Sequence, residues 1–133
     1  MAIVIVVLGL LAAMVIPRIG SGIAQRQIDR AANQLVVDLQ SAGQLAGRHR
    51  KPVRFRQSGI GYEVVDHAVP TTVYIKRALT SASGVNSSSV VVSPTQIVFF
   101  PNGLTSAAGT VTITASGRTR TVSVSRVGHV RRQ

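Results

Sequence analysis

Residues 1–16 read MAIVIVVLGLLAAMVI, a run with no charged and no hydrogen-bonding side chain, and Pro17 and Arg18 end it. The run is typical of a membrane helix. At a rise of about 1.5 Å per residue it spans only roughly 24 Å of a hydrocarbon core about 30 Å thick. A secretory signal peptide is a weaker interpretation, because no positive side chain precedes Arg18 and Leu11-Ala12-Ala13 is a poor cleavage site. A buried core helix or strand is a third interpretation.

The sequence after Pro17 predicts that the helix continues as an amphipathic half over residues 18–47. Apolar side chains recur there at helical spacing, with polar side chains between them. We expect Pro17 to bend the helix, since proline removes a backbone hydrogen bond, and Gly47 to end it. The helix is then apolar all round in its first half and apolar on one stripe in its second. The stripe expected to pack on the rest of the chain holds Ile28, Leu35, Leu39 and Leu45.

Residues 48–133 predict an antiparallel β head, because the apolar period changes from 3.6 to 2 at Lys51. Ser116-Gly117 predicts a two-residue hairpin turn and Pro101-Asn102-Gly103 predicts another turn. A polar loop is expected over Thr80–Ser89. The predicted fold class is α+β, with segments 1–17, 18–47 and 48–133. Strands are expected at 53–56, Tyr62–Val65, Thr72–Ala78, Val90–Ser93, Gln96–Phe100, Thr110–Ala115 and Thr119–Ser125.

The composition gives little support to catalysis or to a cofactor. The chain has no cysteine, which excludes disulfides and thiolate metal sites. Its three histidines and four acidic residues are scattered, without a nucleophile motif or metal-ligand spacing. Residues 67–133 contain no Asp or Glu, which excludes a carboxylate calcium site there. The sequence therefore predicts no enzyme, no metal and no cofactor.

The net charge of +11 favours an anionic partner, although a basic surface that is simply solvated explains it as well. The charge is densest in residues 117–133, which hold five arginines and no acidic residue. These arginines are Arg118, Arg120, Arg126, Arg131 and Arg132.

Three stretches resemble the type IV pilin and type II secretion pseudopilin superfamily, and within it the GspH/FimT branch of minor subunits. Val4–Pro17 is similar to the family's membrane half-helix, with its glycine and bending proline at the expected separation. Leu39–Arg56 resembles the soluble half of the helix leading into a short basic strand, and Ile97–Arg131 resembles the hairpin-rich end of that branch. The resemblance implies a pilin-like fold and a membrane and assembly helix that includes Val4, Gly9, Leu10 and Pro17.

The same resemblance implies partners and a location. The partners are other pilin or pseudopilin subunits and inner-membrane lipid, with the head in the periplasm and the subunit built into a filament. The family's helix begins with a phenylalanine and a glutamate, after a basic leader and a glycine that prepilin peptidase recognises. Here Met1 stands where that block should have ended, so we expect a missing N-terminal block. Prepilin peptidase and methylation are implied only if that block exists.

The resemblance leaves two functions open. The first is a GspH-like minor pseudopilin, a structural subunit of a type II secretion system involved in protein export. The alternative is a FimT-like minor pilin that binds DNA for uptake, because such proteins resemble this chain and bind DNA through a Gly-Arg-x-Arg motif. Gly117–Arg120 fits that motif but falls at the predicted hairpin turn, and Gly128–Arg131 has His129 in place of arginine. A membrane-anchored β protein unrelated to filaments is a third interpretation.

Overall fold

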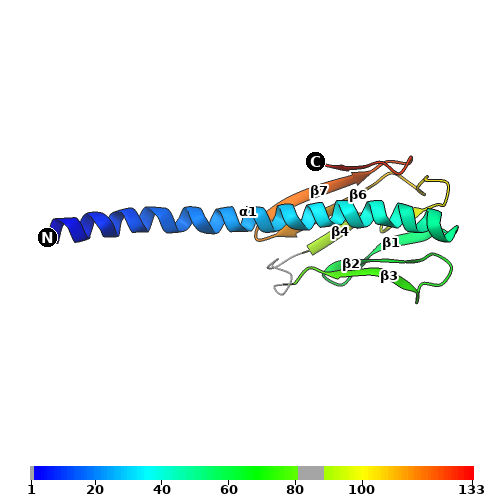
Figure 1. Cartoon of the computed structure of the whole chain (residues 1–133), viewed down its shortest axis with the longest axis horizontal. Helices are drawn as coiled ribbons and strands as arrows, with labels where there is room; N and C mark the ends of the chain where they lie inside the picture. Colours follow the sequence, from blue (N-terminus) through cyan, green and yellow to red (C-terminus); the bar gives the residue numbers. More distant parts are fainter. Residues whose placement is uncertain (1, 81–88) are drawn as a thin grey trace.

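The computed structural model describes residues 2–80 and 89–133, with the backbone alone for residues 14–21. One long helix is followed by short strands, and Figure 1 shows the helix extending well beyond the strands at its N-terminal end. The predicted α+β fold is confirmed. The elements are α1 (Ala2–His49), β1 (Val53–Ser58), β2 (Gly61–Asp66), β3 (Val73–Ala78), β4 (Ser89–Ser93), β5 (Gln96–Phe99), β6 (Gly109–Ala115), β7 (Arg118–Val124) and β8 (Val130–Arg132).

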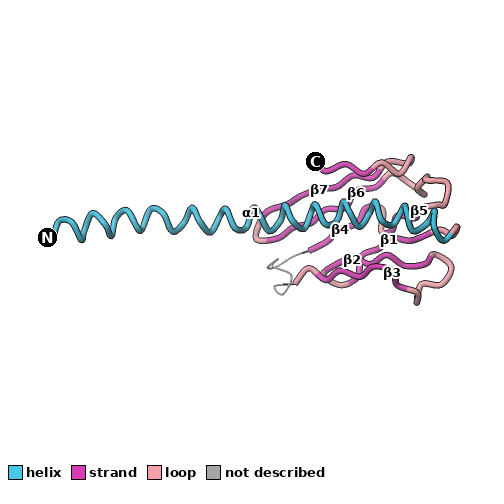
Figure 2. The backbone as a smooth tube through the Cα atoms, in the orientation of Figure 1, coloured by secondary structure: helices cyan, strands magenta, loops and turns pink. Residues whose placement is uncertain are grey.

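The strands form two antiparallel sheets beside the C-terminal half of α1 (Figure 2). The first sheet has the order β3-β2-β1-β5 and the second sheet has the order β4-β6-β7-β8. The chain crosses from the second sheet to the first between β4 and β5, and it returns between β5 and β6. Helix α1 contacts strands of both sheets, so a single helix face closes the core of the whole head.

The core lies between one face of α1 and the inner faces of the two sheets. Ile28, Leu35 and Leu39 are fully buried, and Leu45 is half-buried against the same cluster. Phe55 and Tyr62 pack on each other from neighbouring strands, with ring centroids 5.1 Å apart. Burying such side chains is the main favourable contribution to folding.

The expected end of the helix at Gly47 is wrong by two residues. Helix α1 continues to His49, and Arg50 then adopts a left-handed backbone with φ of 53°. The amide of Lys51 donates to the carbonyl of Ala46, and the amide of Arg50 donates to that of Gly47. These two bonds form a Schellman cap, which satisfies the last carbonyls without a glycine in the left-handed position.

The predicted strands are confirmed to within a few residues at their ends, and β8 is an additional strand that the pattern did not predict. The Ser116-Gly117 hairpin is also confirmed, because both residues have positive φ and join β6 directly to β7. The predicted loop at Thr80–Ser89 falls mostly on residues 81–88, outside the described residues. The bend at Pro17 stays a prediction, although the backbone is helical through that position.

Candidate functional site

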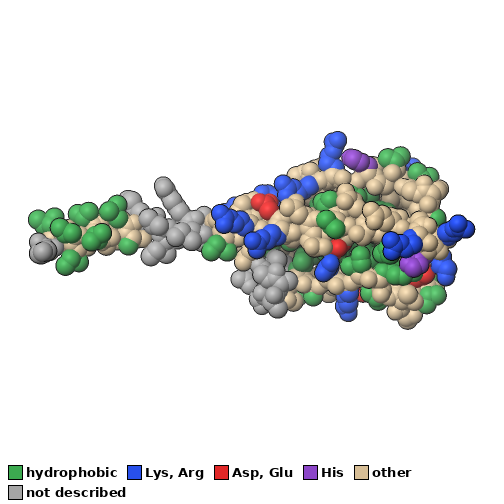
Figure 3. All heavy atoms as spheres, viewed as in Figure 1, with side chains coloured by type: hydrophobic (Ala, Val, Ile, Leu, Met, Phe, Trp, Pro, Cys, Tyr) green, Lys and Arg blue, Asp and Glu red, His purple; other side chains and the backbone are tan. Residues whose placement is uncertain are grey.

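The first half of α1 carries bare apolar side chains. Val4 is 57% exposed and Leu10 is 64% exposed, and no described atom lies within 4 Å of the place that a Cβ on Gly9 would take. Figure 3 shows hydrophobic side chains gathered on the part of the helix that projects from the head. The side chain of Pro17 is not described. No described stretch of the helix combines the length and the hydropathy that a membrane span requires. Exposed apolar surface of this extent marks a site of interaction.

Three arginines of the second sheet donate hydrogen bonds to side chains in the second half of α1. We call this row of contacts the polar ladder. Arg118 donates to Gln25 Oε1 at 2.8 Å, Arg120 donates to Asp29 Oδ1 at 2.9 Å, and Arg132 donates to Asn33 Oδ1 at 2.8 Å. Three of the five arginines that the sequence singled out therefore contact the protein's own helix. Their positions are set by the fold of the head.

The spacing of the two elements explains the polar ladder. Four residues of helix advance about 6 Å, and two residues of strand advance about 6.7 Å, so the two rows stay in step. On β7, Arg118 and Arg120 share a face with the buried Val122 and Val124. Arg132 lies opposite Val122 in the neighbouring strand and so continues the row. Strand alternation along Arg118–Val124 already indicates that its two arginines share a face with its two buried valines. The sequence analysis did not predict from this that the arginines contact α1.

The polar ladder contains one ion pair, between Arg120 and Asp29, which shifts the pKa of the carboxyl group. Hydrogen bonds from Arg120 and then from Gln25 lower the pKa of the Asp29 carboxyl below its ordinary value. Both members of the Arg120–Asp29 pair are about one-third exposed, at 33% and 34% of the side chain. A pair with this exposure contributes modestly to stability and mainly fixes the orientation of the helix on the sheet.

The buried carboxylate of Asp38 joins α1 to the first sheet through hydrogen bonds. Asp38 is 2% exposed and accepts hydrogen bonds from the Tyr62 hydroxyl at 2.7 Å and from Arg77 Nε at 3.1 Å. Gln34 donates to its other oxygen at 3.0 Å. Burial and the bond to Asp38 raise the pKa of Tyr62 far above its ordinary value, and Asp38 raises the pKa of Arg77. Asp38 follows Leu35 by three residues, so helical periodicity already placed it on the buried stripe.

Further polar contacts lie at the end of the first sheet. Asp66 accepts hydrogen bonds from the amides of Val69 and Ala68, which hold the pKa of its carboxyl below the ordinary value. His67 Nδ1 lies 3.0 Å from the guanidinium of Arg54. In the described part of the chain, no cluster of His, Cys, Asp or Glu suits a metal ion.

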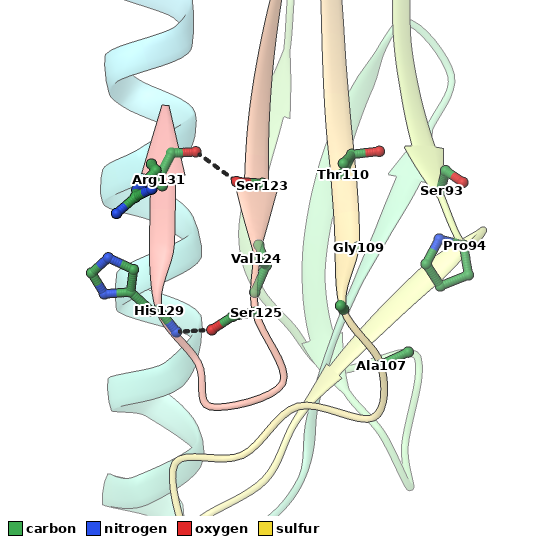
Figure 4. A pocket seen from close by; sticks show the side chains of 11 residues that line it. Ser93, Pro94, Ala107, Gly109, Thr110, Ser123, Val124, Ser125, His129 and Arg131 are labelled. Carbon is green, nitrogen blue, oxygen red and sulfur yellow. Dashed lines mark hydrogen bonds between the residues drawn. The ribbon is translucent and has the colours of Figure 1, made fainter. Parts of the chain in front are cut away.

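Arg126 and Arg131, the other two arginines singled out, are exposed. Arg126 lies in the turn between β7 and β8. Arg131 lines a groove of about 800 Å³ on the outer face of the second sheet, together with His129 (Figure 4). No hydrogen bond joins either guanidinium to another residue in the ranges described. The structure thus splits the predicted arginine set into three that face α1 and two that face outward.

Comparison with known proteins agrees with this architecture. The family described as Type II transport protein GspH matches residues 31–128. The fold is similar to that of the type IV minor pilin FimU of Pseudomonas aeruginosa (strain PAO1) in two crystal forms. One form is 19% identical with a TM-score of 0.63, over 82% of this chain and 90% of that chain. The other is 18% identical with a TM-score of 0.62, over 79% and 91%. No curated protein matches the chain significantly.

Proposed function

Because the chain belongs to the GspH family of type II transport proteins, we propose that it is a minor pseudopilin of a type II secretion system. Members of this family are structural subunits that assemble with other pilin-like subunits. In the proposed role the protein takes one place in a short filament and performs no chemistry of its own. The filament would then act in protein export.

The observation that carries this proposal is the bare apolar half of α1. Val4, Leu10 and their neighbours are exposed, and the described residues of the head leave them uncovered. Burying a side chain of this size is worth about 1.5–3 kcal/mol, so the segment gains most when lipid or apolar helices of neighbouring subunits surround it. We propose that it lies in the inner membrane before assembly and against neighbouring helices afterwards, with the head in the periplasm.

Deleting the gene in its own bacterium tests this role. We expect the exported proteins to accumulate inside the cell and a plasmid copy to restore export. Leu10→Arg should fail to restore it, because arginine in an apolar environment costs several kcal/mol. Thr71→Arg, an exposed loop residue of the head, is the matched control and should restore export. Normal export in the deletion strain would overturn the proposal.

The high positive charge and the two outward-facing arginines favour a second candidate, a FimT-like minor pilin that binds DNA for uptake. Phosphate contacts from arginine give salt-dependent, sequence-independent affinity. A mobility-shift titration with duplex DNA should then show retardation at low salt, and Arg126→Ala with Arg131→Ala should reduce it. Arg118→Ala and Arg120→Ala should reduce it less, since these side chains face α1. Absence of retardation would exclude this candidate.

A further inference from the structure

The groove on the outer face of the second sheet has a mostly apolar lining, which a single row of polar residues crosses. The register pairs Arg131 with Ser123, Ser123 with Thr110, and Thr110 with Ser93. These four residues come from the four strands of the second sheet, and Figure 4 shows them side by side across it. Three hydroxyl-bearing residues therefore form a row with Arg131, whose carbonyl accepts a 3.3 Å hydrogen bond from the Ser123 hydroxyl and whose guanidinium points away from Ser123 (Figure 4).

The groove carries positive charge at Arg131. Its lining includes Arg131 and His129 and contains no acidic residue. No Asp or Glu follows Asp66 anywhere in the sequence, so the chain after β2 offers no side-chain carboxylate to Arg131. A guanidinium with no hydrogen bond to another described residue is suited to a carboxylate or another oxyanion.

A second copy of this chain could supply that carboxylate from a side chain only by giving up a contact within its own fold. The chain has four acidic residues, and each is engaged. Asp29 pairs with Arg120, Asp38 with Arg77 and Glu63 with Arg56. Asp66 accepts from two backbone amides and from Tyr74. Asp38, Glu63 and Asp66 are also buried.

The chemistry of the row also distinguishes among other partners. Bases and sugars are commonly held by stacking on aromatic rings, and the lining contains no Phe, Tyr or Trp. A nucleic-acid backbone presents a regular series of phosphates, whereas the row offers one guanidinium because three other arginines face α1. Hydroxyl groups can donate to and accept from the peptide groups of an extended polypeptide.

From these observations we propose that the groove binds an extended acidic segment of a different protein. A carboxylate of that segment pairs with Arg131, and its backbone lies along the hydroxyl row of Ser123, Thr110 and Ser93. This inference rests on the proposed assembly role for the class of partner, which is a neighbouring subunit other than a copy of this chain.

Nuclear magnetic resonance titration of the full ¹⁵N-labelled chain in neutral detergent micelles tests the site directly. The probe is a short peptide of alternating Glu and Thr, blocked at both ends, and the comparison probe has Gln in place of Glu. We expect the Glu peptide to shift the amides of Ser93, Thr110, Ser123 and Arg131, and the Gln peptide to leave them in place. Arg131→Gln should weaken binding by roughly tenfold, as expected for loss of a charged hydrogen bond. Arg126→Gln, the exposed arginine outside the groove, should leave the affinity unchanged.

Three results with the peptides would overturn the inference. These are no shifts with the Glu peptide, equal binding of the Gln peptide, and equal weakening by Arg126→Gln and Arg131→Gln, which would indicate attraction to the whole basic surface. Tighter binding of duplex DNA at the same amides would also overturn it and assign the groove to phosphate. The binding result is independent of the export assay, so failure of one proposal is distinguishable from failure of the other.

Discussion

The hydroxyl of Tyr62 on β2 donates a 2.7 Å hydrogen bond to the carboxylate of Asp38 on α1, and the two residues are 1% and 2% exposed. This buried bond joins the helix to the first sheet across 24 residues of sequence. It is the counterpart of the polar ladder, which joins the helix to the second sheet at its surface. In addition to the apolar core, polar contacts therefore join the head to α1 at a buried site and along an exposed row.

Tyr62→Phe should destabilise the head, because it removes the donor while Asp38 stays buried. Loss of a hydrogen bond to a buried charged group costs about 1–3 kcal/mol. Urea unfolding of the protein in detergent, followed by circular dichroism, measures the change. Tyr74→Phe is the matched control, since its hydroxyl makes a longer bond of 3.2 Å to Asp66 and the residue is more exposed. Equal stability of Tyr62→Phe and the wild type would contradict this account of the contact.

Alkaline pH should destabilise the native state through the same tyrosine. The pKa of Tyr62 is raised in the folded protein from an ordinary value of 10.0, so its contribution to stability is complete below that pH and is lost as the pH rises above it. We expect the Tm to fall above about pH 10 and Tyr62→Phe to flatten that fall. Near-ultraviolet absorbance of tyrosinate should report ionisation together with unfolding. Ionisation of both tyrosines in the intact fold would show that the environment of Tyr62 is wrongly described.

Acid should destabilise the head through Asp29 and Asp66. The pKa of each carboxyl is lowered in the folded protein from 3.8, so the stability they contribute is present above that value and is lost as the pH falls through the lowered one. The urea midpoint, measured from neutral pH downward, should begin to fall near pH 4. Asp29→Asn should make the fall shallower, and an Asn102→Asp control at an exposed turn should not.

Leu39→Ala should destabilise the head by about 2–5 kcal/mol, because the side chain is fully buried and its removal leaves a cavity between the helix and the sheets. Val37→Ala, two residues earlier on the same helix and 53% exposed, should change the free energy of unfolding by less than about 0.5 kcal/mol. Chemical denaturation of the two variants makes the comparison. A similar loss of stability in the two variants would indicate that the side chain of Val37 packs against another part of the same chain.

Removing the polar ladder should loosen one part of α1 without unfolding the head. Exposed ion pairs contribute about 0–1 kcal/mol each, so the triple variant Arg118→Ala, Arg120→Ala and Arg132→Ala should lose little global stability. Hydrogen exchange should instead accelerate at the helix amides of residues 25–33. Arg126→Ala is the matched control and should leave exchange in that segment unchanged. Unchanged exchange in the triple variant would show that apolar packing alone holds this part of the helix.

Local patterns were enough to predict most of the fold. The change of apolar period from 3.6 to 2 separates helix from strands, and Ser116-Gly117 specifies a tight hairpin because both positions require positive φ. The helix end was misplaced because Arg50 takes the left-handed position that glycine usually occupies. Strand β8 was missed because two of its three residues are arginines, and only its pairing with β7 makes it a strand.

The features of the candidate sites also divide into those that the sequence predicted and those that only the folded structure shows. The apolar first half of α1, its amphipathic second half and the excess of arginine near the C-terminus could all be predicted, because each depends only on composition or on the period along one element. Which arginines contact α1, which face outward, and the contacts of Asp38 with Tyr62 and Arg77 became visible only in the folded chain. Those contacts depend on the register between strands and on the match between helical rise and strand rise, which arise only when distant segments pack together.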